Sequence, residues 1–388
     1  MRILHTSDWH LGRSFGDFRL LDDQQAFLEW LVELCTEQGV ELVAVAGDLF
    51  DRSVPPADAV ALLRDALRSF QAANIEVVAI AGNHDSAERL AAYDGLTEAA
   101  GLLIRGGYER AERVEVRTYS DGPLAIAAVP FLDPVLAPPG YLPEADGAGR
   151  LQRYSHDGVL RTCLDQVRAA TSGQSRSLVL AHAFVAGGEA SESERDLSIG
   201  AVSVVPATVF EGFSYTALGH LHRPQIVAKQ DNIRYSGSPL PYSFSERDDQ
   251  KQVLLVDLAP DGAVSVEAVP VPVGRRAILR SGSFDEVMAS ADVADEPFVR
   301  VELTNQTRVI DAHRRLREKF PFLAEIAYVA DTAVTTPHAP TAAALQKLSP
   351  LEQVQAFWAA NSQTELESDQ ETLVIEVLKK LQADEVWL

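Results

Sequence analysis

Two histidines lie one residue apart in the segment GHLHRP, directly after the apolar run FSYTAL. In an extended chain, side chains at positions i and i+2 point to the same side, so His220 and His222 share one surface. Imidazole nitrogens that converge in this way suit a transition metal better than an apolar core. Other metal-binding side chains are therefore expected at comparable positions.

Polar side chains of similar kinds follow the other apolar runs of the chain, which are RILHTS, ELVAVAG, IEVVAIAG and SLVLAHAF. In α/β proteins, the loops after parallel strands converge beyond the carboxyl edge of the sheet, where ligands bind. The candidate metal ligands are Asp8, His10, Asp48, Asn83, His182, His220 and His222, and the candidate catalytic residues are His84 and Asp85.

Each candidate taken alone has a structural alternative. His10 or His182 could be an interior histidine with satisfied hydrogen bonds, and Asp51 could end a turn before SVPP. Asp85 and Glu88 could form a capping box at the start of the next helix. The joint placement of the set at five strand ends favours the metal-site hypothesis.

Mixed imidazole and carboxylate ligands without thiolates predict a pair of Mn²⁺, Fe²⁺ or Zn²⁺ ions. Asp48 is the best placed to bridge them, with one oxygen for each ion. Two divalent ions facing only Asp8 and Asp48 would keep a charge of about +2, which attracts a phosphodiester. Such a pair clamps a phosphate and activates water. We expect His84 to act as general acid, because it adjoins a ligand and is not needed as one.

The net charge of −22 at first argues against a nucleic-acid-binding protein, because phosphate contacts need lysine and arginine. Exposed charges more than about 8 Å away are largely screened, so the charge at the site matters more than the total. Residues 275–340 carry nine basic and ten acidic residues, whereas residues 341–388 carry three and eight. The segment 275–340 is therefore the least repulsive surface for a polyanion.

The order of the predicted elements shows how the candidate residues are positioned. Short apolar strands alternate with helices at about 22–38, 56–73 and 86–100, and this β-α-β order implies parallel strands. Strands between residues 113 and 269 indicate a second, mixed sheet stacked on the first. The predicted fold class is α/β, with two stacked mixed sheets flanked by helices, a small α+β cap domain and C-terminal helices.

Proline-rich stretches at 268–274 and 335–342 predict two domain boundaries. The predicted domains are a main domain of residues 1–274, an α+β cap of residues 275–340 and C-terminal helices in residues 341–388. One C-terminal helix places an apolar stripe on one face, formed by Leu351, Val354, Phe357 and Trp358. This stripe either packs on the protein's own body or docks into a partner's groove, and we favour the partner.

Composition excludes several other classes of protein. The apolar runs are far shorter than the roughly 20 residues that a bilayer requires, and the N-terminus lacks the apolar core of a secretory signal. We therefore expect a cytoplasmic protein. Cys35 and Cys163 are expected to be buried as small apolar side chains, and His5 to be structural. The sequence contains no Walker A loop, so any ATP hydrolysis must come from a partner.

The segments DWH, GDLFD, GNHD, AHAFVAGG and GHLH resemble the five signatures of calcineurin-like metallophosphoesterases. More narrowly, HTSDWHLGR, QAFLEWL and YSGSPLPYSFSE are similar to the bacterial SbcD family, which supplies the nuclease subunit of the SbcCD DNA-repair complex. The resemblance implies one ion held by Asp8, His10, Asp48 and His222, and another held by Asp48, Asn83, His182 and His220. It implies that His84 contacts the scissile phosphate and protonates the leaving oxygen, while Asp85 orients its ring.

The resemblance also implies a cofactor, a substrate and partners. These are two Mn²⁺ ions per subunit, double-stranded DNA ends and hairpins, and SbcC, a long coiled-coil ATPase. Residues 275–340 would face DNA, and the terminal helices would bind the SbcC coiled coil. Helices 56–73 and 86–100 would form a homodimer within a heterotetramer. At position 51 this chain has Asp where many relatives carry a second active-site histidine, which leaves the role of Asp51 open.

Two other readings of the sequence remain open. One is a stand-alone phosphoesterase that acts on nucleotides or phosphoproteins. The other is a non-catalytic scaffold that binds DNA ends for its ATPase. The complete set of ligands disfavours the scaffold, since a scaffold has no need of His84.

Overall fold

The computed structural model describes residues 1–143, 155–194, 204–291, 295–305, 307–329, 354–355, 358, 370 and 372–375. The chain divides into two compact units. The first comprises Met1–Arg280, Ser290–Val301 and His313–Glu325, and the second comprises Ser281–Ala289, Glu302–Ala312 and Ile326–Leu388. The predicted boundaries after residues 274 and 340 stay predictions.

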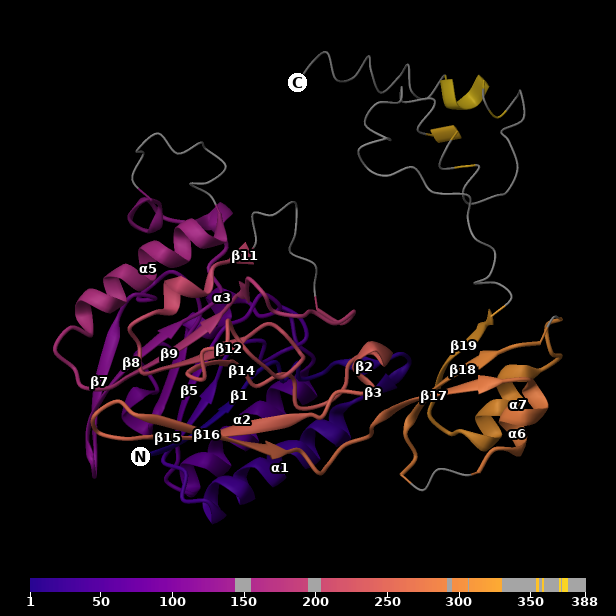
Figure 1. The fold of residues 1–388 in the computed structure, drawn as a ribbon, viewed down its shortest axis with the longest axis horizontal. Coiled ribbons are helices and arrows are strands. Elements are labelled where there is room, and N and C mark those ends of the chain that lie inside the picture. Colours follow the sequence, from indigo (N-terminus) through magenta and orange to yellow (C-terminus); the bar gives the residue numbers. More distant parts are fainter. Residues whose placement is uncertain are drawn as a thin grey trace. The chain divides into compact units, whose positions relative to one another are not determined.

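The first unit holds a six-stranded mixed sheet with the order β16-β15-β1-β4-β5-β6 (Figure 1). The parallel strands are β1 (Arg2–Thr6), β4 (Leu42–Val45), β5 (Glu76–Ile80) and β6 (Leu102–Arg105). The antiparallel strands are β15 (Gln252–Leu258) and β16 (Val264–Pro270). All four residues of β4 are buried, which explains why its sequence LVAV is continuously apolar.

A second six-stranded sheet has the order β13-β14-β12-β9-β8-β7. Its parallel strands are β14 (Ile233–Tyr235), β12 (Tyr215–Gly219), β9 (Ser177–His182) and β8 (Gly122–Val129). The antiparallel edge strands are β13 (Gln225–Ile226) and β7 (Val114–Tyr119). One core cluster joins Leu42 and Val78 of the first sheet to Ile126 and Leu178 of the second, so the two sheets are stacked face to face.

Helices cover the outer faces of this sandwich (Figure 1). α1 (Leu21–Glu37) and α2 (Ala57–Ala72) pack on the first sheet, and α5 (His156–Ala170) packs on the second. Helices on the outer faces of two stacked mixed sheets confirm the predicted α/β fold class. Among the residues that the structure describes, no helix is long and apolar enough to cross a membrane.

A three-stranded sheet with the order β17-β18-β19 follows the sandwich in sequence. Its strands are β17 (Ala277–Gly282), β18 (Phe298–Leu303) and β19 (Leu323–Tyr328), accompanied by α6 (Phe284–Ala289) and α7 (Ala312–Lys319). Within the first unit, the ring of Phe298 stacks on that of Phe15, with 4.5 Å between their centroids.

Short elements complete the described chain. They are β2 (Ser14–Phe15), β3 (Phe18–Arg19), β10 (Phe184–Val185), β11 (Val204–Val205) and the 3₁₀ helices η1 (Glu98–Ala100), η2 (Pro134–Leu136), η3 (Pro139–Tyr141), η5 (Ala207–Phe210) and η6 (Phe244–Glu246). Of the predicted apolar stripe, Val354 and Trp358 are helical, whereas Leu351 and Phe357 lie outside the described residues, as does the stretch 335–342.

The helix predicted at 86–100 is wrong in its length, because α3 covers only Ala87–Ala91. The chain turns at Gly95, whose φ of 73° is a conformation that glycine adopts readily. The capping-box alternative for Asp85 is also wrong. Ser86 is the N-cap residue, and its hydroxyl accepts a main-chain N–H of the first turn at 3.4 Å.

Candidate metal centre

The predicted site residues come from five strand ends, three in the first sheet and two in the second. Asp8 and His10 follow β1, Asp48 follows β4, Asn83, His84 and Asp85 follow β5, His182 ends β9, and His220 and His222 follow β12. The carboxyl edges of both sheets therefore meet at one place. All seven predicted ligands lie there, and all except Asn83 are buried.

One group of side chains surrounds His10. Its Nε2 lies 3.0 Å from Nε2 of His222 and 3.5 Å from Oδ2 of Asp48. Candidate ligand atoms of Asp8, His10 and His222 all lie within 4.8 Å of one another. This group corresponds to the first predicted set of metal ligands.

A second group surrounds the amide of Asn83. Its Oδ1 lies 2.9 Å from Nε2 of His182 and 3.1 Å from Nδ1 of His220. Nε2 of His182 also lies 3.5 Å from Oδ2 of Asp48. The same carboxylate oxygen of Asp48 therefore faces both groups, which is a position suited to a bridging ligand. This differs from the expected arrangement of one oxygen for each ion, because Oδ1 accepts the main-chain N–H of His84.

The polar atoms of these groups are better arranged to bind divalent cations than to form hydrogen bonds with one another. Nδ1 of His182 donates to the carbonyl of Ala46 at 3.0 Å, so Nε2 carries the lone pair that faces the carbonyl oxygen of Asn83. Nδ1 of His10 and Nδ2 of Asn83 are buried without a hydrogen-bond partner among the described residues. Ligands of one octahedral ion at about 2.1 Å lie about 3 Å apart, which is the spacing found here.

Burial sets the protonation of the site. It lowers the pKa of His10, His182 and His220, which keeps these imidazoles neutral and able to bind a metal. Burial, followed by the charge of Asp48, raises the pKa of Asp8 well above its usual range. A bound cation would offset this cost and keep Asp8 ionised.

The backbone at the strand ends is strained. Asp8, His10, Asp48 and His220 all have positive φ, at 54°, 44°, 48° and 109°. A residue other than glycine held in this region costs on the order of 1–3 kcal/mol, and such strain clusters at functional sites. Hydrogen bonds across the strand ends stabilise it, including the one from the N–H of His220 to Asp8 at 3.0 Å.

Two glycines beside the ligands are required by close packing. A Cβ on Gly47 would lie 2.1 Å from Nδ1 of His182, and a Cβ on Gly82 would lie 2.1 Å from Oδ1 of Asp48. In the sequences GD after β4 and GN after β5, the second residue therefore supplies a candidate ligand, and the glycine leaves room for the side chain of another candidate ligand.

His84 lies beside the first group, with its ring centroid 4.7 Å from that of His10. Its main-chain N–H donates to Oδ1 of Asp48 at 2.9 Å. The ring is held by Nδ1, which donates to the main-chain carbonyl of Asp51 at 2.9 Å. His84 also lies near enough to His10 and Asp48 to form a third possible ligand group with them.

The expectation that Asp85 orients the ring of His84 is wrong, because that ring is held by the main-chain carbonyl of Asp51 and Asp85 has other partners. The buried carboxylate of Asp85 accepts the main-chain N–H groups of Leu49, Phe50 and Gly82, at 2.9–3.0 Å. It therefore ties the loop after β4 to the loop after β5. Its three donors are backbone groups, which residue types alone do not reveal.

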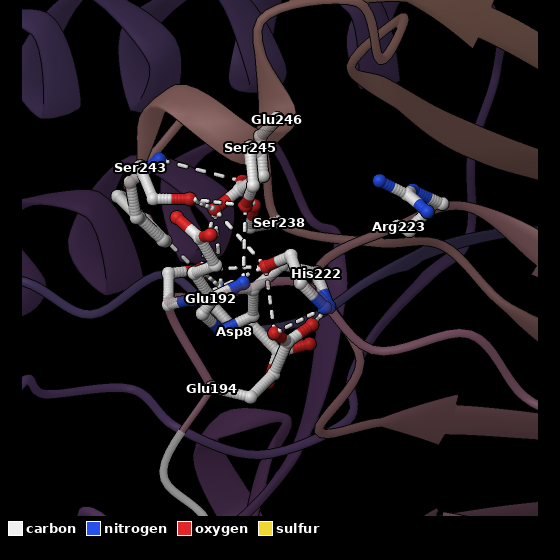
Figure 2. A network of polar contacts seen from close by, with 12 residues as sticks. Asp8, Glu192, Glu194, His222, Arg223, Ser238, Ser243, Ser245 and Glu246 are labelled. Carbon is white, nitrogen blue, oxygen red and sulfur yellow. Dashed lines mark hydrogen bonds and ion pairs between the residues drawn. The ribbon is translucent and has the colours of Figure 1, made fainter. Parts of the chain in front are cut away.

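Sequence reasoning did not assign roles to a polar network on the far side of His222, part of which Figure 2 shows. The network contains Ser193, Glu194, Ser238, Glu246 and Lys251. The segment YSGSPLPYSFSE, which contains Glu246, was noted only for its resemblance. Nothing in residue type or spacing marks Ser193.

A family model described as calcineurin-like phosphoesterase matches residues 1–224, the part of the chain that contains every predicted metal ligand. The chain belongs to the calcineurin-like phosphoesterase family. A second family model, SbcD_C, described as type 5 capsule protein repressor C-terminal domain, matches residues 276–362 of this phosphoesterase. Together the two matches confirm the predicted resemblance to SbcD-type nucleases.

Two solved structures resemble the phosphoesterase at low sequence identity. The crystal structure of the protein TT1561 of Thermus thermophilus is 15% identical, covers 69% of this chain and 98% of its own, and gives a TM-score of 0.38. A dimetal phosphatase from Danio rerio is 13% identical, covers 70% of this chain and 96% of its own, and gives a TM-score of 0.43.

The family uses divalent metals, and the phosphoesterase has candidate metal-binding groups at the edge where its two sheets meet. The protein is therefore a metal-dependent phosphoesterase.

Proposed function

We propose that the protein is an SbcD-type nuclease of the cytoplasm that hydrolyses phosphodiester bonds at double-stranded DNA ends and hairpins. The observation that carries the proposal is the position of Asp48. Its Oδ2 lies 3.5 Å from Nε2 of both His10 and His182, so one carboxylate oxygen is common to two ligand groups. A bridged pair of cations is the arrangement that stabilises both the attacking and the leaving oxygen of a phosphodiester.

The proposed cofactor is a pair of Mn²⁺ ions. One would be held by Asp8, His10, Asp48 and His222, and the other by Asp48, Asn83, His182 and His220, all of which converge in the structure. When bound, the ions would supply Lewis acidity and an activated water. With two divalent ions bound, the neutral imidazoles and the two carboxylates would leave the site with a net positive charge. This charge would attract a phosphodiester despite the acidic protein.

His84 is the proposed general acid. Because Nδ1 is engaged by the carbonyl of Asp51, Nε2 is the nitrogen that remains to give a proton to the leaving oxygen. Asp85 enters the proposal as a positioning residue, because its carboxylate fixes the two loops that carry Asp48 and His84.

The proposed partner is an SbcC-type coiled-coil ATPase, which would bind the helices in residues 341–388. The match of the SbcD_C family model to residues 276–362 supports this assembly. We propose that residues 275–340 face DNA, since this segment carries nearly balanced charge in an acidic chain.

The proposed homodimer, within a heterotetramer, uses the face formed by α2 and α3. A groove of about 530 Å³ lies there, and its lining includes Leu63, Leu67 and Leu90. Three large apolar side chains are exposed on or beside this face, namely Val60, Tyr93 and Leu96. An apolar patch of this kind is typical of a protein interface.

The proposal is tested by incubating the purified protein with a labelled blunt duplex and a labelled hairpin. The reactions contain Mn²⁺, Mg²⁺ or a chelator, with and without the SbcC-type ATPase and ATP. We expect Mn²⁺-dependent cleavage of both DNAs. Hydrolysis of small phosphomonoesters without cleavage of either DNA would favour a stand-alone phosphoesterase, and DNA binding without any hydrolysis would favour a scaffold.

A further inference from the structure

The imidazole of His222 has polar contacts on both of its nitrogens. Nε2 faces the first ligand group, 3.0 Å from Nε2 of His10. Nδ1 points the other way and lies 2.5 Å from the hydroxyl oxygen of Ser193. Ser193 also hydrogen-bonds to Oε1 of Glu246, a residue of η6 that Figure 2 shows beside His222.

Glu246 is a buried charge with a buried counterion. Its side chain is inaccessible to solvent, and Nζ of Lys251 donates to its Oε2 at 2.5 Å. Lys251 also donates to the main-chain carbonyl of His222 at 3.0 Å. This buried ion pair with Lys251 makes Glu246 an ionised carboxylate, which can only accept hydrogen bonds.

The direction of the hydrogen bonds follows from this ionisation. Since Glu246 only accepts, the hydroxyl proton of Ser193 points to Glu246. The oxygen of Ser193 must then accept from Nδ1–H of His222. A neutral imidazole with its proton on Nδ1 presents the lone pair of Nε2, the atom that faces the ligand group.

The main chain of the same residue is fixed as well. Oε1 of Glu194 accepts the N–H of His222 at 2.8 Å, and Oε2 of Glu194 accepts from the hydroxyl of Ser191 at 2.6 Å. Figure 2 shows Glu194 and Glu246 on either side of His222. His222 is thus restrained at its ring, its N–H and its carbonyl by residues that are distant in sequence.

We propose that Ser193 and Glu246 are positioning residues that hold His222 as its Nδ1–H tautomer and direct its Nε2 toward the first metal ion. This inference rests on the proposed function, because it takes His222 to be a metal ligand. Partners that orient a ligating histidine typically contribute 10–100-fold to metal affinity.

The test is titration of the full-length protein with Mn²⁺, followed by calorimetry and by metal analysis after ultrafiltration. We expect Ser193→Ala and Glu246→Gln to weaken the binding of one of the two ions about 10-fold or more and to leave the affinity for the other unchanged. Ser193→Thr keeps the hydroxyl and should bind both ions as the wild type does. The matched control is Ser243→Ala, since Ser243 contacts the same carboxylate at 3.2 Å and does not contact His222.

Unchanged binding of both ions by Ser193→Ala would overturn the proposal, and so would equal weakening of both ions. Glu246→Gln leaves Lys251 without its counterion and could unfold, so Ser193→Ala, at a partly exposed position, is decisive. Circular dichroism of each variant without metal checks the fold. His222→Ala separates the two hypotheses, because wild-type binding of both ions by that variant would contradict the ligand set and not only the positioning role.

Discussion

The ring of His84 is anchored to the main chain of Asp51, whose carbonyl accepts from Nδ1 at 2.9 Å. The partner is a backbone atom, so this orientation does not depend on which side chain stands at position 51.

Replacement of the His84 ring should reduce cleavage of DNA without reducing metal binding. We expect His84→Ala to retain two metal ions and to lose cleavage by about 10²-fold or more, because proton transfer to the leaving oxygen is lost. Single-turnover cleavage of a labelled duplex, with metal content measured on the same sample, checks this. Gly140→Ala, whose added Cβ would meet no atom within 4 Å, is the control. Normal turnover in His84→Ala would remove the proposed role.

Replacement of the bridging carboxylate should act on both ligand groups. Oδ2 of Asp48 is 3.5 Å from each of two imidazoles in different groups, so Asp48→Ala should empty at least one metal site. Metal analysis after dialysis measures the number of ions retained. Two ions per chain in Asp48→Ala would contradict the bridge.

Close packing at Gly82 predicts a large effect from a single methyl group. A Cβ there would lie 2.1 Å from Oδ1 of Asp48, so Gly82→Ala should displace the carboxylate. We expect weaker metal binding and a loss of about 1–3 kcal/mol in the free energy of unfolding, as is typical of overpacking. Gly140→Ala is the matched control, because no atom lies within 4 Å of its added Cβ. Equal urea midpoints for the two variants would refute this prediction.

Metal affinity should rise with pH. Burial lowers the pKa of His10, His182 and His220, so these ligands are already neutral near pH 7. Burial, followed by the charge of Asp48, raises the pKa of Asp8, so protons compete with the ion there at higher pH than at an exposed aspartate. We therefore expect proton release on Mn²⁺ binding, and weaker binding and activity as the pH falls.

Calorimetry in buffers of different ionisation enthalpy measures this proton release. Asp8→Asn should abolish most of it, since the amide carries no titratable proton. A proton count that is equal in the wild type and in Asp8→Asn would assign the competing proton to another group.

Removal of residues 341–388 should separate assembly from catalysis. None of the proposed metal ligands lies in this segment, so the truncated protein should keep Mn²⁺-dependent cleavage. Its binding to the SbcC-type ATPase should be abolished, as measured by co-elution in size-exclusion chromatography. Co-elution equal to that of the full chain would place the partner surface elsewhere.

The sequence predicted the sheets and the convergence of the candidate ligands because both obey short-range rules. Each apolar run is a buried strand, and the polar residue that follows it must lie at the carboxyl edge of its sheet. Asp48 and His182 were identified in this way, and the structure places them 3.5 Å apart although 134 residues of sequence separate them.

The remaining features depend on contacts that no spacing rule encodes. Ser193 lies in an irregular segment and Glu246 in the short 3₁₀ helix η6, and the donors to Asp85 are backbone groups. The helix at 86–100 was predicted too long, because α3 ends at Ala91 and the chain turns at Gly95, whose φ is positive.

Each ligand group combines side chains from both sheets, since β1, β4 and β5 belong to one and β9 and β12 to the other. Bound ions would thus cross-link the two sheets at one edge. Sliding of one layer over the other would pull the candidate ligands apart, so the apolar cluster that contains Leu42, Ile126 and Leu178 should help to maintain the spacing of the proposed metal ligands. Substitutions in this shared interior should alter turnover without touching any polar atom of the centre.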